Sequence, residues 1–221
     1  MLIVPPLHVI FACDGVLIDS TWIIADCITE ALAEIGLTLE PLEVRQRYAE
    51  LPVSAVAGQA EAETGAPVPE GWAEQLAAEI QTRVKFRGRP VQHVADAVRK
   101  IQAKGVRTSV WSPAPPERIT VPLGMTGLLY LFNPRLYSAG ILERDDACPE
   151  ILALTARISG IVPNRTVVVD STVAGVAAAV AAGMTPFAYV GDRSTDAAGL
   201  AGAGATLVKD MRELPKALKL G

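Results

Sequence analysis

Aromatic residues, histidines and cysteines are scarce in this chain. Only 5% of its 221 residues are Phe, Trp or Tyr, and there are two histidines and three cysteines. Cys13, Cys27 and Cys148 form no CxxC pair and no cluster with histidine, so we expect no zinc site. An odd and sparse cysteine count is typical of a protein of the reducing cytoplasm.

The chain also lacks an excess of positive charge and any long hydrophobic run. Its formal net charge is −4, which gives no electrostatic reason to expect a nucleic-acid or membrane partner. The apolar stretch Val173–Met184 is too short to span a membrane. The apolar run Leu2–Val16 carries Asp14 and lacks the basic start of a signal peptide. We therefore expect a cytoplasmic protein that binds neither nucleic acid nor a membrane.

What the chain has in abundance is Ala, Val and Leu, and 50% of its residues are hydrophobic. This composition favours helices packed on a buried parallel sheet. Short apolar runs alternate with helical patterns, which predicts an α/β fold with a Rossmann-like, doubly wound parallel sheet. The expected strands are Val9–Ala12, Val106–Trp111, Thr166–Val169, Pro186–Val190 and Thr206–Val208. The helices expected after the second strand cover 115–122, 149–159, 174–182, about 195–201 and 210–219, and 128–138 looks irregular.

The segment after the first strand is different, because its pattern is helical throughout. Thr21–Ile35 has apolar residues at helical spacing, and further helices are expected over 41–50, 53–64 and 70–85. No convincing strand interrupts them. We therefore expect a helical unit of residues 18–86 inserted into an α/β core of residues 1–17 and 87–221.

Ligands of such folds bind at the carboxyl ends of the strands. These ends fall near Ala12, Ser112 and Asp170.

Four segments around these strand ends resemble the motifs of the haloacid dehalogenase-type hydrolases, in the right order and with the right intervals. The resemblance is close to the phosphoglycolate, 6-phosphogluconate and phosphoglucomutase relatives. It implies that residues 18–86 are a helical cap of the first type. The matching segments are Phe11–Ser20 (compare FDxDGVLxDS), Val110–Ser112, Val167–Met184 (compare VVVEDSxxGxxAAxAAGM) and Gly202–Pro215.

The resemblance also implies the role of each motif position. The family's nucleophilic Asp, which attacks phosphorus, corresponds to Ala12. Its general acid and base corresponds to Asp14, and its phosphate-binding hydroxyl to Ser112. Its phosphate-binding Lys corresponds to Asp146, and its Mg²⁺-binding Asp to Ser171. An engineered Asp→Ala change would explain Ala12 alone, whereas natural loss of the chemistry explains all three departures.

Several residues keep two interpretations. Asp14 either retains a catalytic role or fixes the turn at Gly15, and Ser112 is either a ligand-binding or a plain strand-end hydroxyl. Asp170 could bind a metal ion if the fourth motif slips by one residue. Cys13 is expected to be a small packing residue, and His8 and His93 match no catalytic position.

The remaining charges suggest an anionic site. Asp14, Asp146 and Asp170 would repel phosphate if all three faced the strand-end site. We therefore expect phosphate to bind weakly or not at all. We also expect no bound cofactor and only weak binding of Mg²⁺. Arg144 either replaces the missing Lys or is solvated beside Glu143 or Asp145. Trp111 is unusual at a strand end and would fill volume that the family leaves for substrate.

Two functions are compatible with these features. The first is a catalytically inactive or impaired member of the family that binds a small ligand or a protein partner. The alternative is a hydrolase of the phosphatase or phosphomutase type, acting on a small phosphorylated metabolite, with altered metal-dependent chemistry built on Asp14, Asp170 and Asp146.

Overall fold

The computed structural model describes residues 4–48, 51–192 and 195–221. The chain divides into two compact units, Met1–Asp19 with Pro90–Gly221, and Ser20–Arg89. The sequence predicts 18–86 for the inserted unit. Each unit is described by itself below.

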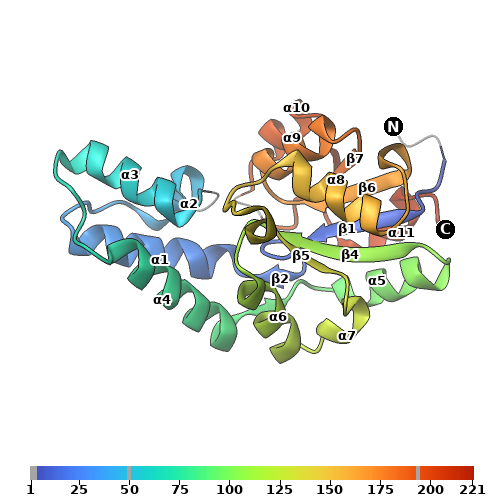
Figure 1. Cartoon of the computed structure of the whole chain (residues 1–221), viewed down its shortest axis with the longest axis horizontal. Helices are drawn as coiled ribbons and strands as arrows, with labels where there is room; N and C mark the ends of the chain where they lie inside the picture. Colours follow the sequence, from blue (N-terminus) through green and yellow to red (C-terminus); the bar gives the residue numbers. More distant parts are fainter. Residues whose placement is uncertain (1–3, 49–50, 193–194) are drawn as a thin grey trace. The chain divides into compact units, whose positions relative to one another are not determined.

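The first unit is built on a parallel sheet in the order β5-β4-β1-β6-β7-β8 (Figure 1). The two central strands β1 and β6 are buried along their whole length, which is why they appear in the sequence as continuous apolar runs. This confirms the predicted doubly wound α/β fold. The strands are β1 (His8–Ala12), β4 (Arg107–Ser112), β5 (Leu136–Ser138), β6 (Thr166–Asp170), β7 (Thr185–Tyr189) and β8 (Thr206–Val208).

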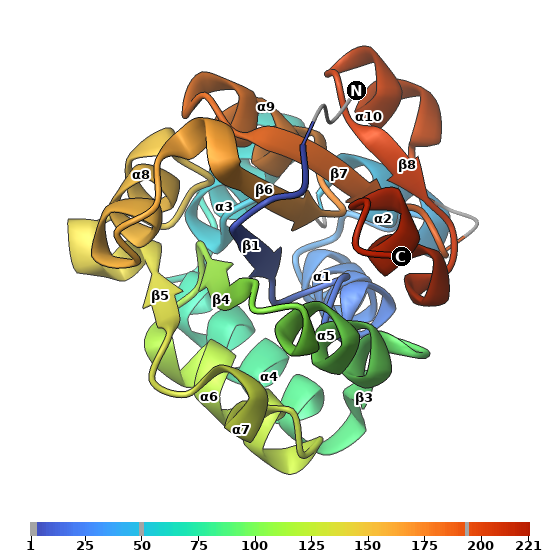
Figure 2. The same cartoon turned by 90° about the vertical axis from the view of Figure 1, so that its right-hand side faces the viewer.

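Helices cover both faces of this sheet (Figure 2). The amphipathic pattern of α5 shows why: its buried residues Val94, Ala97, Val98 and Ile101 recur at helical spacing. On one face lie α8 (Pro149–Ile158), α9 (Val173–Ala181) and α10 (Ala197–Gly202). On the other lie α5 (Val94–Ala103), α6 (Pro116–Met125), α7 (Leu129–Phe132) and α11 (Leu214–Ala217).

Three segments of the first unit differ from the sequence prediction. The stretch 128–138, expected to be irregular, contains helix α7 and the edge strand β5, whose short lengths carry little periodic signal. The helix expected over 210–219 is instead a 3₁₀ turn, Met211–Glu213, followed by the single turn of α11. Helix α6 also continues to Met125, three residues beyond its predicted end, with Pro122 inside it.

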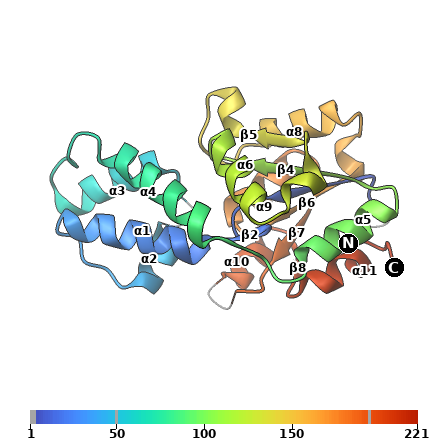
Figure 3. The ribbon, with the colours of Figure 1, turned by 90° about the horizontal axis from the view of Figure 1, so that it is seen from below.

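The second unit is helical (Figure 3). It contains α1 (Thr21–Glu34), α2 (Pro41–Arg47), α3 (Val53–Thr64) and α4 (Trp72–Arg87), and α1 packs against both α2 and α4. Within its described residues the only strand residue is Arg89, at its end, which begins the two-residue strand β3 (Arg89–Pro90).

Among the described residues, no helix combines the length and the apolar character that a membrane crossing requires.

Candidate functional site at the strand ends

The three strand ends predicted from the sequence lie side by side. Ala12 is in register with Trp111 on β4, and Phe11 is in register with Val169 on β6, so Asp170 follows beside Ala12. The chain leaves β1 toward β4 and leaves β6 toward β7, on opposite sides. The carboxyl ends of β1 and β6 therefore form the switch point at which such sheets bind ligands.

The acid/base position, Asp14, is held by an arginine that sequence analysis did not single out. Oδ2 of Asp14 accepts a hydrogen bond from Nη2 of Arg118 at 3.0 Å, and the two side chains are 23% and 11% exposed. Gly15 makes the turn beside Asp14, with a φ of 73°, and its N–H donates to the carbonyl of Ile18 at 2.8 Å. Asp14 thus lies in the turn at Gly15 and its carboxylate pairs with Arg118, while a catalytic role for it stays a prediction.

Arg118 was missed because it lies in the proline-rich start of α6, where the sequence pattern leaves the helix register open. Pro122 lacks the N–H that would bond to the carbonyl of Arg118, four residues before it. That carbonyl instead faces the thiol of Cys13, with 3.9 Å between sulfur and oxygen. Burial raises the pKa of the Cys13 thiol well above its ordinary value, so it stays a neutral, weak donor. Cys13 is therefore a packing residue, as the sequence predicts.

Ser112 is buried, and its hydroxyl belongs to the turn that follows β4. Its Oγ accepts a hydrogen bond from the N–H of Ala114 at 3.1 Å. Its register partner Ser138 donates from Oγ to the carbonyl of Ala114 at 2.6 Å. The two serines thus fix the loop between β4 and α6, which supports the interpretation of Ser112 as a strand-end hydroxyl.

Asp170 is only 2% exposed, and one of its oxygens is fully used within the chain. Oδ1 accepts hydrogen bonds from the N–H of Ser171 (2.8 Å), the N–H of Thr172 (2.9 Å) and the Thr172 hydroxyl (2.8 Å). Burial raises the pKa of Asp170, while these hydrogen bonds act in the opposite direction. The Thr172 hydroxyl in turn accepts from the N–H of Gly175 and caps α9. Asp170 therefore organises the start of α9.

The side chain of Trp111 completes the site. It is 2% exposed, and its indole N–H lies near the carboxyl of Asp170 and favours the charged form of that group. Among the described residues, neither Nε1 of Trp111 nor Oδ2 of Asp170 forms a hydrogen bond of normal geometry. The indole therefore extends from β4 across β1 toward β6.

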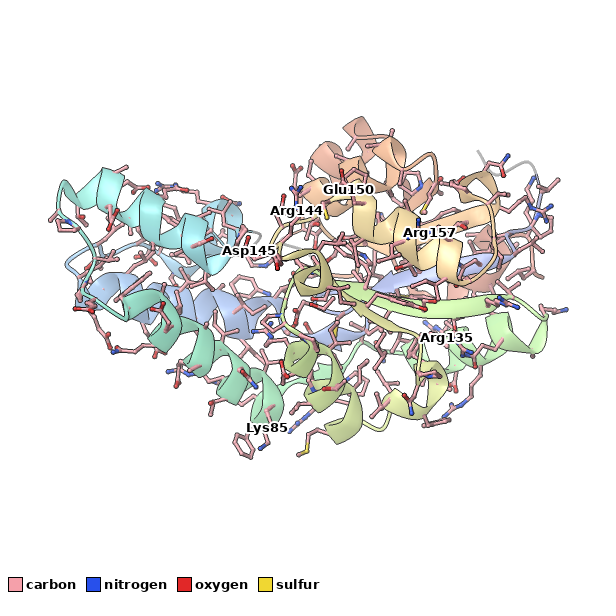
Figure 4. The ribbon with its side chains drawn as sticks, viewed as in Figure 1. Lys85, Arg135, Arg144, Asp145, Glu150 and Arg157 are labelled. Carbon is pink, nitrogen blue, oxygen red and sulfur yellow. The ribbon has the colours of Figure 1, made fainter. Side chains whose placement is uncertain are left out.

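Asp146, at the position of the family's Lys, does not have the neighbours expected from the sequence. Asp146 accepts two hydrogen bonds from Arg144, from Nε at 2.7 Å and from Nη2 at 2.6 Å. Both side chains are almost half exposed, at 45% and 44%, in the loop before α8, where Figure 4 labels Arg144 and Asp145. The expected partners of Arg144 were Glu143 and Asp145, and this expectation is corrected because the bidentate pair forms with Asp146. Because Arg144 and Asp146 pair with each other, their charges balance. The site therefore carries less negative charge than the three carboxylates predicted from the sequence would give it.

The donor set does not fit the Mg²⁺ ion that the family resemblance implies. Positions 12 and 171 hold Ala and Ser, Asp14 faces a guanidinium, and Asp170 uses Oδ1 to bind backbone and hydroxyl groups. In the part of the chain that the structure describes, no group of three or more His, Cys, Asp or Glu residues is arranged to hold a metal ion. Hard divalent cations need several oxygen ligands at one point, and this site does not provide them.

Comparisons with known proteins agree with this architecture. A family model described as haloacid dehalogenase-like hydrolase matches residues 7–183. The chain is 25% identical over 185 residues to 6-phosphogluconate phosphatase of Escherichia coli (strain K12), covering 83% of this chain and 82% of that protein. A conserved haloacid dehalogenase-like protein of unknown function from Agrobacterium tumefaciens superposes with a TM-score of 0.87 at 28% identity, over 97% of this chain and 98% of that one. A hydrolase of the same type from Deinococcus radiodurans, solved with bound phosphate and sodium, superposes with a TM-score of 0.80 at 27% identity, over 98% and 96% of the two chains.

Proposed function

This chain belongs to the haloacid dehalogenase-like hydrolase family, and we propose that it has lost the family's covalent phosphatase chemistry and acts by binding a small ligand or a protein partner. The proposal rests on one observation. The residue at the end of β1, where the family places its nucleophile, is Ala12, whose methyl group can neither attack phosphorus nor bind a metal ion.

The neighbouring groups support this proposal because each is already engaged by the chain itself. Asp14 pairs with Arg118, Asp170 accepts three hydrogen bonds at the start of α9, and Ser112 accepts one from its own turn. None of these arrangements leaves a nucleophile beside a general base. For comparison, removing the nucleophile from a covalent hydrolase costs up to about 10⁶-fold in rate.

The test is a phosphatase assay of the purified chain with p-nitrophenyl phosphate and 6-phosphogluconate, the second chosen for the activity named for the Escherichia coli relative. We expect no turnover above background, with that relative as the positive control. Ala12→Asp alone should also stay inactive, since Asp146 and Ser171 still replace the family's Lys and Asp. The matched variant has the family residue at all three positions: Ala12→Asp, Asp146→Lys and Ser171→Asp.

One observation favours a second candidate, a hydrolase with altered chemistry. Asp14 keeps the family's acid/base position and remains 23% exposed beside Arg118. It could take a proton from a water molecule that attacks phosphorus directly, in place of the family's nucleophilic carboxylate. A turnover of about 1 s⁻¹, the lower end of ordinary enzymes, that disappears in Asp14→Asn would establish this candidate and refute the first. Thr155→Ala is the control for a general loss of stability, because it removes a buried hydroxyl that donates to the carbonyl of Ile151 within α8.

A further inference from the structure

The packing at the strand ends shows what now occupies the space of the lost nucleophile. Trp111 has the largest of the fully buried side chains among the described residues. Neighbouring strands lie about 4.8 Å apart, so the backbones of β4 and β6 are roughly 10 Å apart with β1 between them. An indole that starts on β4 and reaches the carboxyl of Asp170 on β6 must lie over Ala12.

The identity of residue 12 follows from this arrangement. Residues in register on parallel strands direct their side chains to the same face of the sheet, so Ala12 and Trp111 compete for one volume. Only a small side chain at position 12 leaves room for the ring. The Asp that the family has at this position would meet the indole and would bring a second carboxylate close to Asp170.

We propose that Trp111 fills the ligand position of the strand-end site with the chain's own side chain and thereby closes this site to phosphate esters and other small ligands. Trp111 is then the residue that determines what the site admits. A ligand or partner of this protein binds at another surface, or binds here only when the indole moves. This goes beyond the proposed function, because it concerns the occupant of the site and not the chemistry of position 12.

The experiment is a packing cycle that contains no phosphatase assay, so its outcome is independent of the proposed function. Urea unfolding midpoints are measured for the parent, Ala12→Val, Trp111→Leu and the double variant. In the parent, the added methyl groups collide with the indole, so Ala12→Val should lower the midpoint. In Trp111→Leu, the same groups enter space that the ring has vacated, so Ala12→Val should raise the midpoint.

The matched control is Ala60→Val, a change at a fully buried alanine of α3 in the other unit. It should shift the midpoint equally with Trp111 or Leu at position 111. An Ala12→Val shift of the same sign and size in both backgrounds would show that the indole does not cover Ala12, and the proposal would be wrong. Should Trp111→Leu fail to fold, Trp111→Phe takes its place, and the same reversal of sign is required.

Discussion

At the scale of single residues, the carboxyl group of Asp170 explains why residue 175 is glycine. A Cβ atom at position 175 would overlap both oxygens of that carboxyl, although the backbone of residue 175 has an ordinary helical conformation. The glycine is needed for close approach and not for a special φ. Gly175 belongs to one of the motifs that carry the family resemblance. Close packing between the end of β6 and the start of α9 therefore requires glycine at this motif position.

Gly175→Ala should destabilise the chain by about 1–3 kcal/mol, the range for overpacking a tight site. The control is Gly58→Ala in α3, where a Cβ would meet nothing within 4 Å. There the better helix propensity of Ala should stabilise the chain by about 0.5–1 kcal/mol. Both values come from urea unfolding at neutral pH. Equal effects of the two substitutions would contradict the packing explanation.

His8 gives the second prediction at this scale. It is fully buried in β1, its Nε2 lies 2.8 Å from the hydroxyl oxygen of Ser109, and Arg107 and Arg135 lie near it. Burial, followed by these two positive charges, lowers the pKa of His8 from 6.5 to about 4. The unfolded chain therefore binds a proton between these values that the folded chain does not bind. Stability is complete above about pH 6.5 and falls as the pH decreases toward about 4.

Between about pH 7 and about pH 5, this difference removes roughly 2 kcal/mol from the free energy of unfolding. His8→Gln, which keeps a polar group beside Ser109 but does not titrate, should lose that much less over the same interval. The measurement is urea unfolding of both proteins at the two pH values. An identical pH dependence of the parent and His8→Gln would rule out His8 as the cause.

At the scale of secondary-structure elements, helix α6 is attached to the turn after β1 through one residue. Arg118 donates to Asp14 from its guanidinium, and its backbone carbonyl faces the thiol of Cys13. Its Nε has no partner among the described residues and is buried. The start of α6 and the strand-end turn are therefore coupled, because a change in either displaces the shared contact.

A double-mutant cycle between Asp14→Asn and Arg118→Met should give a coupling free energy of about 1–3 kcal/mol, as expected for a largely buried charged pair in contact. The matched control is the cycle between Arg144→Met and Asp146→Asn. That bidentate pair is almost half exposed on both sides, so its coupling should stay at about 0–1 kcal/mol. Urea unfolding supplies all the values. A coupling for Asp14 and Arg118 no larger than that of the exposed pair would show that α6 is not anchored in this way.

At the scale of the whole molecule, the sheet order brings together residues that are far apart in the sequence. Ala12, Trp111 and Asp170 belong to three neighbouring strands, and Asp14 meets Arg118 from a helix on one face of the sheet. Under the proposed function, these contacts take the place of a bound metal ion and phosphate at the strand ends. We therefore expect the first unit to be complete without a cofactor.

Millimolar Mg²⁺ or inorganic phosphate should leave the melting temperature of this protein unchanged, and EDTA should not lower it. A ligand present at about 100 times its Kd would stabilise the folded state by about 2.7 kcal/mol, which is easily detected. The positive control for phosphate is the Deinococcus radiodurans relative, which was solved with bound phosphate. A saturable rise in the melting temperature with either ion would contradict the absence of a metal and phosphate site.

The sequence alone predicted the α/β class, the helical pattern of residues 21–85 and the strand ends at Ala12, Ser112 and Asp170. These features depend on local periodicity and on buried apolar runs, which can be recognised in the amino-acid sequence itself. It also predicted, from the family resemblance and the motif spacing, that Ala12 stands at the nucleophile position.

Only the tertiary structure decided which charges and which rings meet. Arg118 and Asp14 are 104 residues apart in the sequence, and no local pattern reports a contact at that separation. The helix that carries Arg118 was uncertain because of its prolines, and Arg144 pairs with Asp146 rather than with Glu143 or Asp145. The placement of Trp111 over Ala12 likewise depends on strand order and register, which arise when the whole sheet assembles and not from any one segment.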